Sequence, residues 1–279
     1  FIAISRLRAL HISLGENVPP AVSKSFTALI PTILTLSLFA VLAAILANVL
    51  HTDLIHLITT FIQQPLRLIN TSLPGTIFIY SFGNFLFTLG IHQSVVNSVV
   101  LEPFLLINTN ENMLAFANGQ PIPHIINNIF VPTFGMVGGT GSTISLLIAI
   151  FIFSRQKSAK QVARLSLAPG LFNINEPVIF GMPVMLNPIL AIPFIITPLV
   201  TGSIGYFATV TGFAGKAVVM VPWTTPPLIN AWLSTAGSMG AVITQFICIV
   251  TAVIIYLPFV KIASRRADQA ALQQATDNA

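Results

Sequence analysis

The chain has 279 residues, of which 54% are hydrophobic and only 7% are charged, against roughly 25% charged residues in soluble domains. Together with a mean hydropathy of +0.89, this excludes an ordinary soluble domain and predicts an integral membrane protein. The formal net charge of +5 does not indicate nucleic-acid binding, because the basic residues cluster beside apolar stretches, where they act as topology signals.

Three basic clusters bracket the apolar stretches and set the predicted topology. They lie in the segment 1–25, in the central loop from Arg155 to Arg164, and in the tail 261–279. By the positive-inside rule all three face the cytoplasm, so both ends are cytoplasmic and the crossings between clusters are even in number. The fold class is an all-α integral membrane bundle, polytopic, with about six spans: 26–50, 71–91, 93–107, 131–153, 178–208 and 238–260.

The N-terminal part divides into a cytoplasmic segment, 1–25, and a first span with an amphipathic connector, 26–70. The chain starts at Phe1 without an initiator methionine and reads as the C-terminal portion of a longer protein. His51, Asp53 and His56 have the residue types of a metal site, but their spacing matches no strong ligand signature. No metal site is predicted.

The main bundle, 71–260, contains irregular stretches that interrupt the predicted spans. The span 93–107 is short and carries Glu102 and Pro103, which makes it the weakest of the six. Irregular backbone is expected at 108–128 on the outside, at 168–177 on the inside, and at 221–230, which holds three prolines. Because polar or proline-broken backbone in a membrane bundle marks a substrate path, we expect these stretches to line one.

Glycines and a cysteine in the bundle have structural interpretations. Gly135, Gly138, Gly139 and Gly141 form a patch without the Lys-Ser/Thr ending of a P-loop, so close helix packing or a bend is expected there. Cys248 stands alone in an apolar stretch and is interpreted as a small core residue.

Glu176 is the only charged residue between Arg164 and Lys216 in the sequence, and it lies in Asn173-Ile174-Asn175-Glu176-Pro177. An ionisable group at membrane depth is costly unless it faces a polar cavity or a partner, so it is a functional hypothesis by default. Pro177 is expected to end any helix that enters from the N-terminal side. The alternative is a glutamate that caps a short cytoplasmic helix beside the membrane.

Four motifs along the chain carry a resemblance to a known family. They are Leu14-Gly15-Glu16-Asn17-Val18-Pro19-Pro20, Gly90-Ile91-His92-Gln93, Asn118-Gly119-Gln120-Pro121-Ile122-Pro123-His124, and Asn173-Ile174-Asn175-Glu176-Pro177. With them the chain resembles the sugar-translocating enzyme IIC of the bacterial phosphotransferase system, in its lactose/cellobiose/diacetylchitobiose branch. The Asn-Ile-Asn-Glu-Pro motif is the most specific of the four.

The resemblance implies a sugar site and assigns its residues. The region 71–260 resembles the family's sugar-transport domain, which implies two re-entrant or broken hairpins, near 108–128 and 165–178. The N-terminal bundle that forms the family's homodimer interface is expected to lie outside this sequence. His92 and Glu176 resemble the pair that holds the sugar hydroxyl to be phosphorylated, with either as the catalytic base. Asn173 and Asn175 offer donors and acceptors to further hydroxyls, and Trp223 resembles the aromatic residue that stacks on the sugar. The alternatives are a helix-end histidine and an interfacial anchor tryptophan.

The implied function is the permease component of a phosphoenolpyruvate-dependent sugar transport system in the bacterial cytoplasmic membrane. It would move a β-linked disaccharide such as cellobiose and present it to phosphorylated enzyme IIB. Enzyme IIA and the phosphocarrier protein HPr would be indirect partners. The phosphoryl donor residue is then on enzyme IIB, and no cofactor is expected. Two alternatives stay open: a proton-coupled secondary sugar transporter in which Glu176 and His92 relay protons, and a truncated remnant that does not transport.

Overall fold

The computed structural model describes residues 1–12, 20–49, 52–53, 57, 60, 64–154, 156–182 and 184–277. Every regular element within these residues is helical. Contacts divide the chain into two units, Phe1–Leu66 and Arg67–Ala279. Most of the Leu14–Pro20 motif, the possible metal ligands His51 and His56, and Arg155 of the central basic cluster lie outside the described residues.

The first unit contains one long apolar helix. A short helix α1 (Ile2–Ser5) and a 3₁₀ turn η1 (Arg8–Leu10) precede α2 (Pro20–Val49). Within α2, Phe26–Val49 is long and apolar enough to cross a membrane. Its side chains are mostly exposed within the unit, as expected for a helix whose apolar surface faces lipid. The first predicted span is therefore confirmed as a helix of spanning length and composition.

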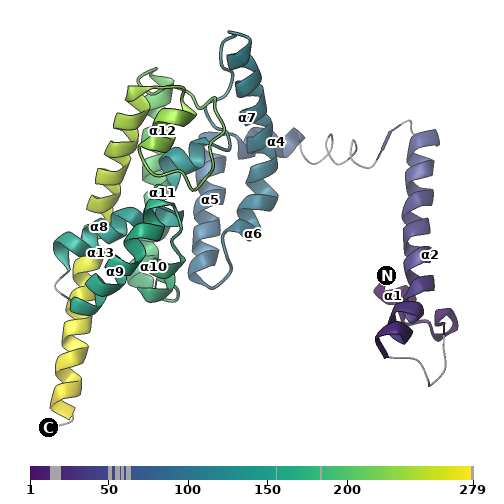
Figure 1. Ribbon diagram of the computed structural model, residues 1–279, viewed down its shortest axis with the longest axis horizontal. Coiled ribbons are helices and arrows are strands. Elements are labelled where there is room, and N and C mark those ends of the chain that lie inside the picture. The colour runs from purple at the N-terminus through teal and green to yellow at the C-terminus, as the bar shows by residue number, and fades with distance from the viewer. Residues whose placement is uncertain are drawn as a thin grey trace. The chain divides into compact units, whose positions relative to one another are not determined.

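The second unit, which Figure 1 shows from blue to yellow, holds the remaining helices. Its first helix, α4 (Gln64–Asn70), begins just before the boundary. Then follow α5 (Leu73–Thr88), α6 (Ser94–Val96), the π-helix η3 (Asn97–Leu101), α7 (Glu102–Ala117), the π-helix η4 (Val131–Gly135), the 3₁₀ turn η5 (Thr140–Ser142), α8 (Thr143–Phe153), α9 (Lys157–Leu171), α10 (Glu176–Gly181), α11 (Pro188–Val210), α12 (Ile229–Ser234) and α13 (Met239–Asp277).

Four spans satisfy length and composition among the described residues, so the predicted six are not confirmed. They are Phe26–Val49, Val131–Phe153, Pro188–Val210 and Met239–Gln269. The predicted span 71–91 contains α5, which has only 16 residues, fewer than the ~20 that a crossing helix needs. The predicted span 93–107 is divided among α6, η3 and α7. The predicted span 178–208 starts too early, because α10 ends at Gly181 and α11 begins at Pro188, where Asn187 caps it.

The irregular stretches are shorter than the sequence suggested. Helix α7 continues to Ala117, so irregular backbone begins at Asn118 rather than at 108. Helix α9 continues to Leu171, although Pro169 lies in its last turn. Pro177 does not end a helix: it occupies the first turn of α10, where its missing N–H costs nothing.

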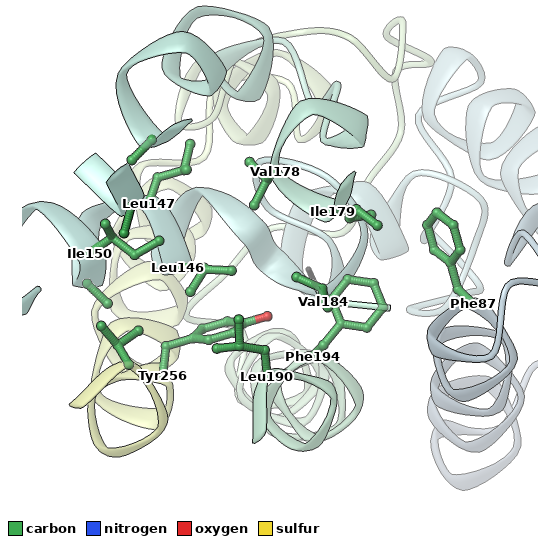
Figure 2. Close-up of a cluster of buried hydrophobic side chains, with 14 residues drawn as sticks. Phe87, Leu146, Leu147, Ile150, Val178, Ile179, Val184, Leu190, Phe194 and Tyr256 are labelled. Carbon is green, nitrogen blue, oxygen red and sulfur yellow. The ribbon is translucent and has the colours of Figure 1, made fainter. Parts of the chain in front are cut away.

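One hydrophobic cluster joins α8, α10, α11 and α13. Figure 2 shows Leu146 and Leu147 of α8, Ile179 of α10, Phe194 of α11 and Tyr256 of α13 converging there. The hydroxyl of Tyr256 donates to the carbonyl of Gly141 at 2.7 Å, which ties the glycine-rich turn to this core.

A second cluster contains Cys248, whose side chain is 1% exposed, together with residues of α5, α7 and the 126–134 region. Its Sγ donates to the carbonyl of Thr201 at 3.4 Å. The interpretation of Cys248 as a core residue is confirmed.

Buried amide side chains bond to backbone groups that prolines and turns leave without helical partners. Pro198 has no N–H to donate to the carbonyl of Phe194, and that carbonyl accepts from Nδ2 of Asn84 at 3.2 Å instead. On α13, Nε2 of the fully buried Gln245 donates to the carbonyl of Thr133 at 2.6 Å. Such pairing is what permits broken backbone at membrane depth.

Candidate functional site

A cavity of about 410 Å³ opens in the second unit, lined by segments distant in the sequence. Its walls come from Tyr80 on α5, the stretch 92–105, residues between 128 and 140, the stretch 173–176, and Trp223. All five side chains predicted as site residues line this one cavity: His92, Asn173, Asn175, Glu176 and Trp223.

His92 follows the end of α5, and local hydrogen bonds set its tautomer. The backbone N–H of Ser94 donates to Nδ1 of His92 at 3.2 Å, and Oγ of Ser94 lies 2.8 Å from the same nitrogen. Since Nδ1 accepts from an N–H, the proton of the neutral ring is on Nε2. The ring packs against Phe87, with 4.6 Å between ring centroids. Nε2–H is therefore available as a donor to a ligand, while Phe87 and Ser94 fix the ring's orientation.

Glu176 lies in the first turn of α10, and its exposed side chain faces the same cavity. Both it and His92 are among the described residues, and no ion pair joins them. The two predicted residues thus line one cavity and leave their side chains available to a ligand. The carboxylate of Glu176 accepts hydrogen bonds and donates none, whereas His92 offers a donor. Together they can bind the proton and the oxygen of a hydroxyl group.

Asn173 uses its side-chain amide to hold two irregular segments together. Its Oδ1 accepts from the N–H of Gly138 at 2.7 Å, and its Nδ2 donates to the carbonyls of Trp223 at 2.5 Å and Thr225 at 3.2 Å. Both amide protons are thereby used, and the side chain is buried. The backbone of Asn173 has a φ of 61°, a left-handed conformation that asparagine tolerates better than most residues. Asn173 lines the cavity chiefly as the residue that positions Trp223.

Asn175 is held in a similar way on the opposite side of the turn. Its Nδ2 donates to the carbonyl of Thr140 at 2.8 Å. The approach is close because Gly139, at a φ of 100°, has no Cβ: a Cβ there would lie 2.8 Å from the Asn175 side chain. Gly141, at a φ of 72°, leaves room for the Phe194 ring in the same way. The glycine patch therefore forms a bend that packs closely against the site and against α11.

Trp223 lies in the proline-rich stretch between α11 and α12, where irregular backbone was predicted. The N–H of Thr225 donates to the carbonyl of Pro222 at 2.9 Å and closes a turn around the tryptophan. With its carbonyl bonded to Asn173 and its side chain 56% exposed, Trp223 has a fixed backbone and a free ring face. This is the arrangement that stacking on a flat apolar ligand face requires.

Sequence reasoning missed part of the cavity wall. Glu102 lines it and is half-buried, whereas the sequence marks Glu102 only as a residue that weakens a predicted span. The π-helices η3 and η4 both contribute to the wall, through residues such as Asn97 and Val131, and π-helical segments are frequent at functional sites. The signal that could have found Glu102 is the one used for Glu176: a carboxylate in an otherwise apolar stretch.

A separate polar cluster anchors the segment that follows α7. Nη2 of Arg67 donates to Oε2 of Glu111 at 2.8 Å, and Nε2 of His124 bonds the same oxygen. Asn112 accepts from the N–H of His124 at 2.9 Å and donates to the carbonyl of Ala217 at 3.0 Å. Burial raises the pKa of the Glu111 carboxyl, but the hydrogen bonds from Arg67 and His124 outweigh it and hold that pKa below its usual value. This Arg67–Glu111–His124 cluster was not predicted from the sequence.

Comparison with known proteins supplies relatives over most of the chain. The family model described as "Phosphotransferase system, EIIC" matches residues 1–198. The lichenan permease IIC component of Bacillus subtilis (strain 168) is 36% identical over 253 residues, covering 90% of this chain and 56% of the relative. The oligo-beta-mannoside-specific EIIC component of the same organism is 37% identical, with 90% and 57% covered.

Two further relatives extend the comparison to a cellobiose component and a solved structure. The cellobiose-specific EIIC component of Lactococcus lactis subsp. lactis (strain IL1403) is 35% identical, covering 93% of this chain and 57% of the relative. The crystal structure of the transporter ChbC, the IIC component from the N,N'-diacetylchitobiose-specific phosphotransferase system, has 35% identity and a TM-score of 0.78, covering 95% of this chain and 62% of that one.

The chain thus spans between half and two thirds of the length of the relatives it matches. The family model covers more than half of the chain, and the likeness extends to the fold. This chain belongs to the enzyme IIC family of the phosphotransferase system, as its motifs had suggested.

Proposed function

We propose that this chain is the sugar-translocating part of an enzyme IIC that moves a β-linked disaccharide such as cellobiose across the bacterial cytoplasmic membrane. The observation that carries the proposal is the single cavity that brings together His92, Glu176 and Trp223. A neutral hydroxyl-rich ligand with one apolar ring face matches a donor, an acceptor and a free tryptophan face. The relatives named for cellobiose, lichenan and oligo-beta-mannoside support a β-linked substrate.

In this proposal Glu176 and His92 orient the hydroxyl that is phosphorylated. A phosphorylated enzyme IIB, with a phosphocysteine as its donor, supplies the phosphoryl group. The phosphorus–sulfur bond breaks, a phosphorus–oxygen bond forms on the sugar hydroxyl, and the proton of that hydroxyl passes to Glu176 or His92 as base. The thiolate stays on enzyme IIB. Positioning of the hydroxyl is the contribution of this chain.

Helix α9 offers a surface for the phosphorylated partner. Lys157, Lys160 and Arg164 have side chains in solvent or half-buried, while Ala159 and Ala163 are buried on the opposite face of the helix. The helix leads directly into the stretch 173–176. A basic face next to the site favours the approach of a negatively charged phosphoprotein. In the proposed orientation α9 and both ends of this sequence are cytoplasmic.

The energy source of uptake tests the proposal. The chain in its full-length context, reconstituted in vesicles with enzyme IIB, enzyme IIA and HPr, should accumulate disaccharide phosphate only when phosphoenolpyruvate is supplied. Accumulation of unmodified sugar that a protonophore abolishes would instead establish a proton-coupled transporter. Absence of uptake under both conditions, together with absence of sugar binding, would identify a non-transporting remnant.

A further inference from the structure

Two carboxylates, those of Glu102 and Glu176, line the sugar cavity together with His92 and the phenol of Tyr80. Across residues 64–154, 156–182 and 184–277 no lysine or arginine lines the cavity. This is unusual for a site that handles phosphate, because phosphoryl groups are ordinarily met by arginine, lysine or a metal ion.

Glu102 has no cation to offset it, in contrast to another glutamate on the same helix. Glu111, farther along α7, bonds Arg67 and His124. No ion pair or hydrogen bond of the Glu102 side chain is found within the described residues. Pro103 and the preceding π-helix η3 fix where the α-helical turn bearing Glu102 begins. The carboxylate is thus built into the wall, half-buried and uncompensated.

We infer that Glu102, acting with Glu176, makes this cavity select the neutral disaccharide over its phosphorylated product, so that phosphorylation itself drives release of the sugar. The inference rests on the proposed function. It assigns to Glu102 a specificity role separate from the hydroxyl-orienting role of Glu176 and His92. The cavity should accordingly bind uncharged sugars more tightly than sugar phosphates or uronic acids.

The physical reason lies in what the sugar presents before and after transfer. A hydroxyl can donate its proton to either carboxylate, while a phosphate monoester carries about −1.5 to −2 charge at pH 7 and presents acceptor oxygens. The transferred phosphoryl group brings negative charge into the cavity. The hydroxyl proton only moves to a base in the same cavity, so the cavity and its contents become more negative overall. In a partly enclosed cavity the repulsion between like charges is much larger than in water. Bound product is therefore disfavoured where bound substrate is stabilised.

Binding measurements on the purified full-length protein in lipid nanodiscs test this inference. Calorimetric titration with cellobiose and with its 6-phosphate should give wild-type dissociation constants that differ by at least about tenfold in favour of the free sugar. Glu102→Gln keeps the size of the side chain and removes its charge, so it should reduce this ratio roughly tenfold by tightening phosphosugar binding, since the repulsion is Coulombic. The wild-type ratio should also fall as salt is raised, because screening weakens it.

Asp268→Asn is the matched control, because it removes a carboxylate from an exposed position on α13 outside the cavity. Its ratio should equal that of the wild type. Equal wild-type affinities for sugar and sugar phosphate, or an unchanged ratio in Glu102→Gln, would overturn the inference. Either result would follow if a cation or a shared proton neutralised the two carboxylates. Failure of the wild type to bind disaccharide at all would refute the proposed function instead, so the two failures are distinguishable.

Discussion

At the scale of single residues, Glu176 contributes an acceptor that no neutral side chain of the same size reproduces. Glu176→Gln keeps the shape but loses a charge-assisted hydrogen bond to the sugar, which we expect to weaken disaccharide binding by about 1.5–3 kcal/mol. Isothermal titration of the purified variant measures this loss, and the phosphorylation rate should fall with it. Unchanged affinity together with unchanged phosphorylation would remove Glu176 from the site.

Trp223 should act on the ligand more than on the fold, because its ring is largely exposed while its backbone is bonded to Asn173. Trp223→Ala should weaken sugar binding and leave the melting temperature nearly unchanged, and Trp223→Phe should retain part of the affinity, since a smaller aromatic face still stacks. Thermal unfolding and titration of both variants separate the two effects. A variant that extracts or folds poorly but binds sugar normally would favour a membrane anchor instead.

The residue types at the site were readable from the sequence, and their roles were readable only in part. Glu176 stands out as a lone charge in an apolar region, whereas His92 and Trp223 are singled out by their resemblance to residues of the enzyme IIC family. The structure brings all three to one cavity. Their contact with sugar stays a prediction. Whether an amide bonds a ligand or the protein's own backbone depends on tertiary contacts. The hydrogen bonds that Asn173 makes to Gly138 and Thr225 could therefore not be anticipated.

At the scale of elements, Asn173 joins the glycine turn to the tryptophan segment, and its loss should loosen both. Asn173→Gly preserves the left-handed backbone and removes only the side-chain bonds, while Asn173→Ala removes the bonds and adds backbone strain. Each buried group left without a partner costs about 1–3 kcal/mol. We expect Asn173→Gly to melt below the wild type and Asn173→Ala below both, with weaker sugar binding in each.

The same two variants show whether Asn173 joins the two segments or contacts the sugar directly. If both melted like the wild type while sugar binding disappeared, Asn173 would contact the sugar rather than position Trp223. A measurement of tryptophan fluorescence without sugar supplies a second readout, because only a displaced segment changes the environment of Trp223 in the empty protein.

The Arg67–Glu111–His124 cluster should make the segment after α7 sensitive to acid. Since the pKa of Glu111 is lowered from its usual 4.5, its contribution to stability is present above 4.5 and is lost as pH falls through the lower folded value. Glu111→Gln should therefore lose less stability than the wild type between neutral pH and pH values below 4.5. The difference will be modest, because Glu111 is 41% exposed and solvent screens the pair. Parallel slopes in thermal melts against pH would contradict this.

Element boundaries were harder to predict than element type. Apolar length alone located α2, α11 and α13, but it could not reveal that α5 stops at Thr88 or that a π-helix divides 93–107. The π-helix has a side chain from another helix at its backbone, since Nδ2 of Asn70 donates to the carbonyl of Val100 at 2.6 Å. Helix α5 ends before the left-handed Gly90, and the carbonyl of Thr88 accepts from the distant N–H of Leu186 at 2.8 Å. Such bonds between distant residues leave no periodic trace in the sequence.

At the scale of the whole molecule, the proposed division of labour places the phosphoryl carrier on another protein. Cys248 is buried in the second hydrophobic cluster and donates to Thr201, so it has no access to a phosphoryl donor. Cys248→Ser can keep this hydrogen bond and Cys248→Ala cannot, and we expect both to transport near normally with a packing loss of about 1 kcal/mol. Radiolabelled phosphate that appears on this chain and disappears in these variants would contradict the division.

The backbone conformation and the hydrogen bonds at position 173 together restrict which amino acid can occupy it. The place demands a residue that accepts a left-handed backbone and that offers two donors and one acceptor within a single short side chain. Glycine meets the first demand only, aspartate lacks the donors, and glutamine reaches one methylene too far. Of the twenty letters only asparagine meets both demands. The asparagine that opens Asn-Ile-Asn-Glu-Pro is therefore fixed by the protein's internal geometry, and it would be retained in a chain whose sugar had changed.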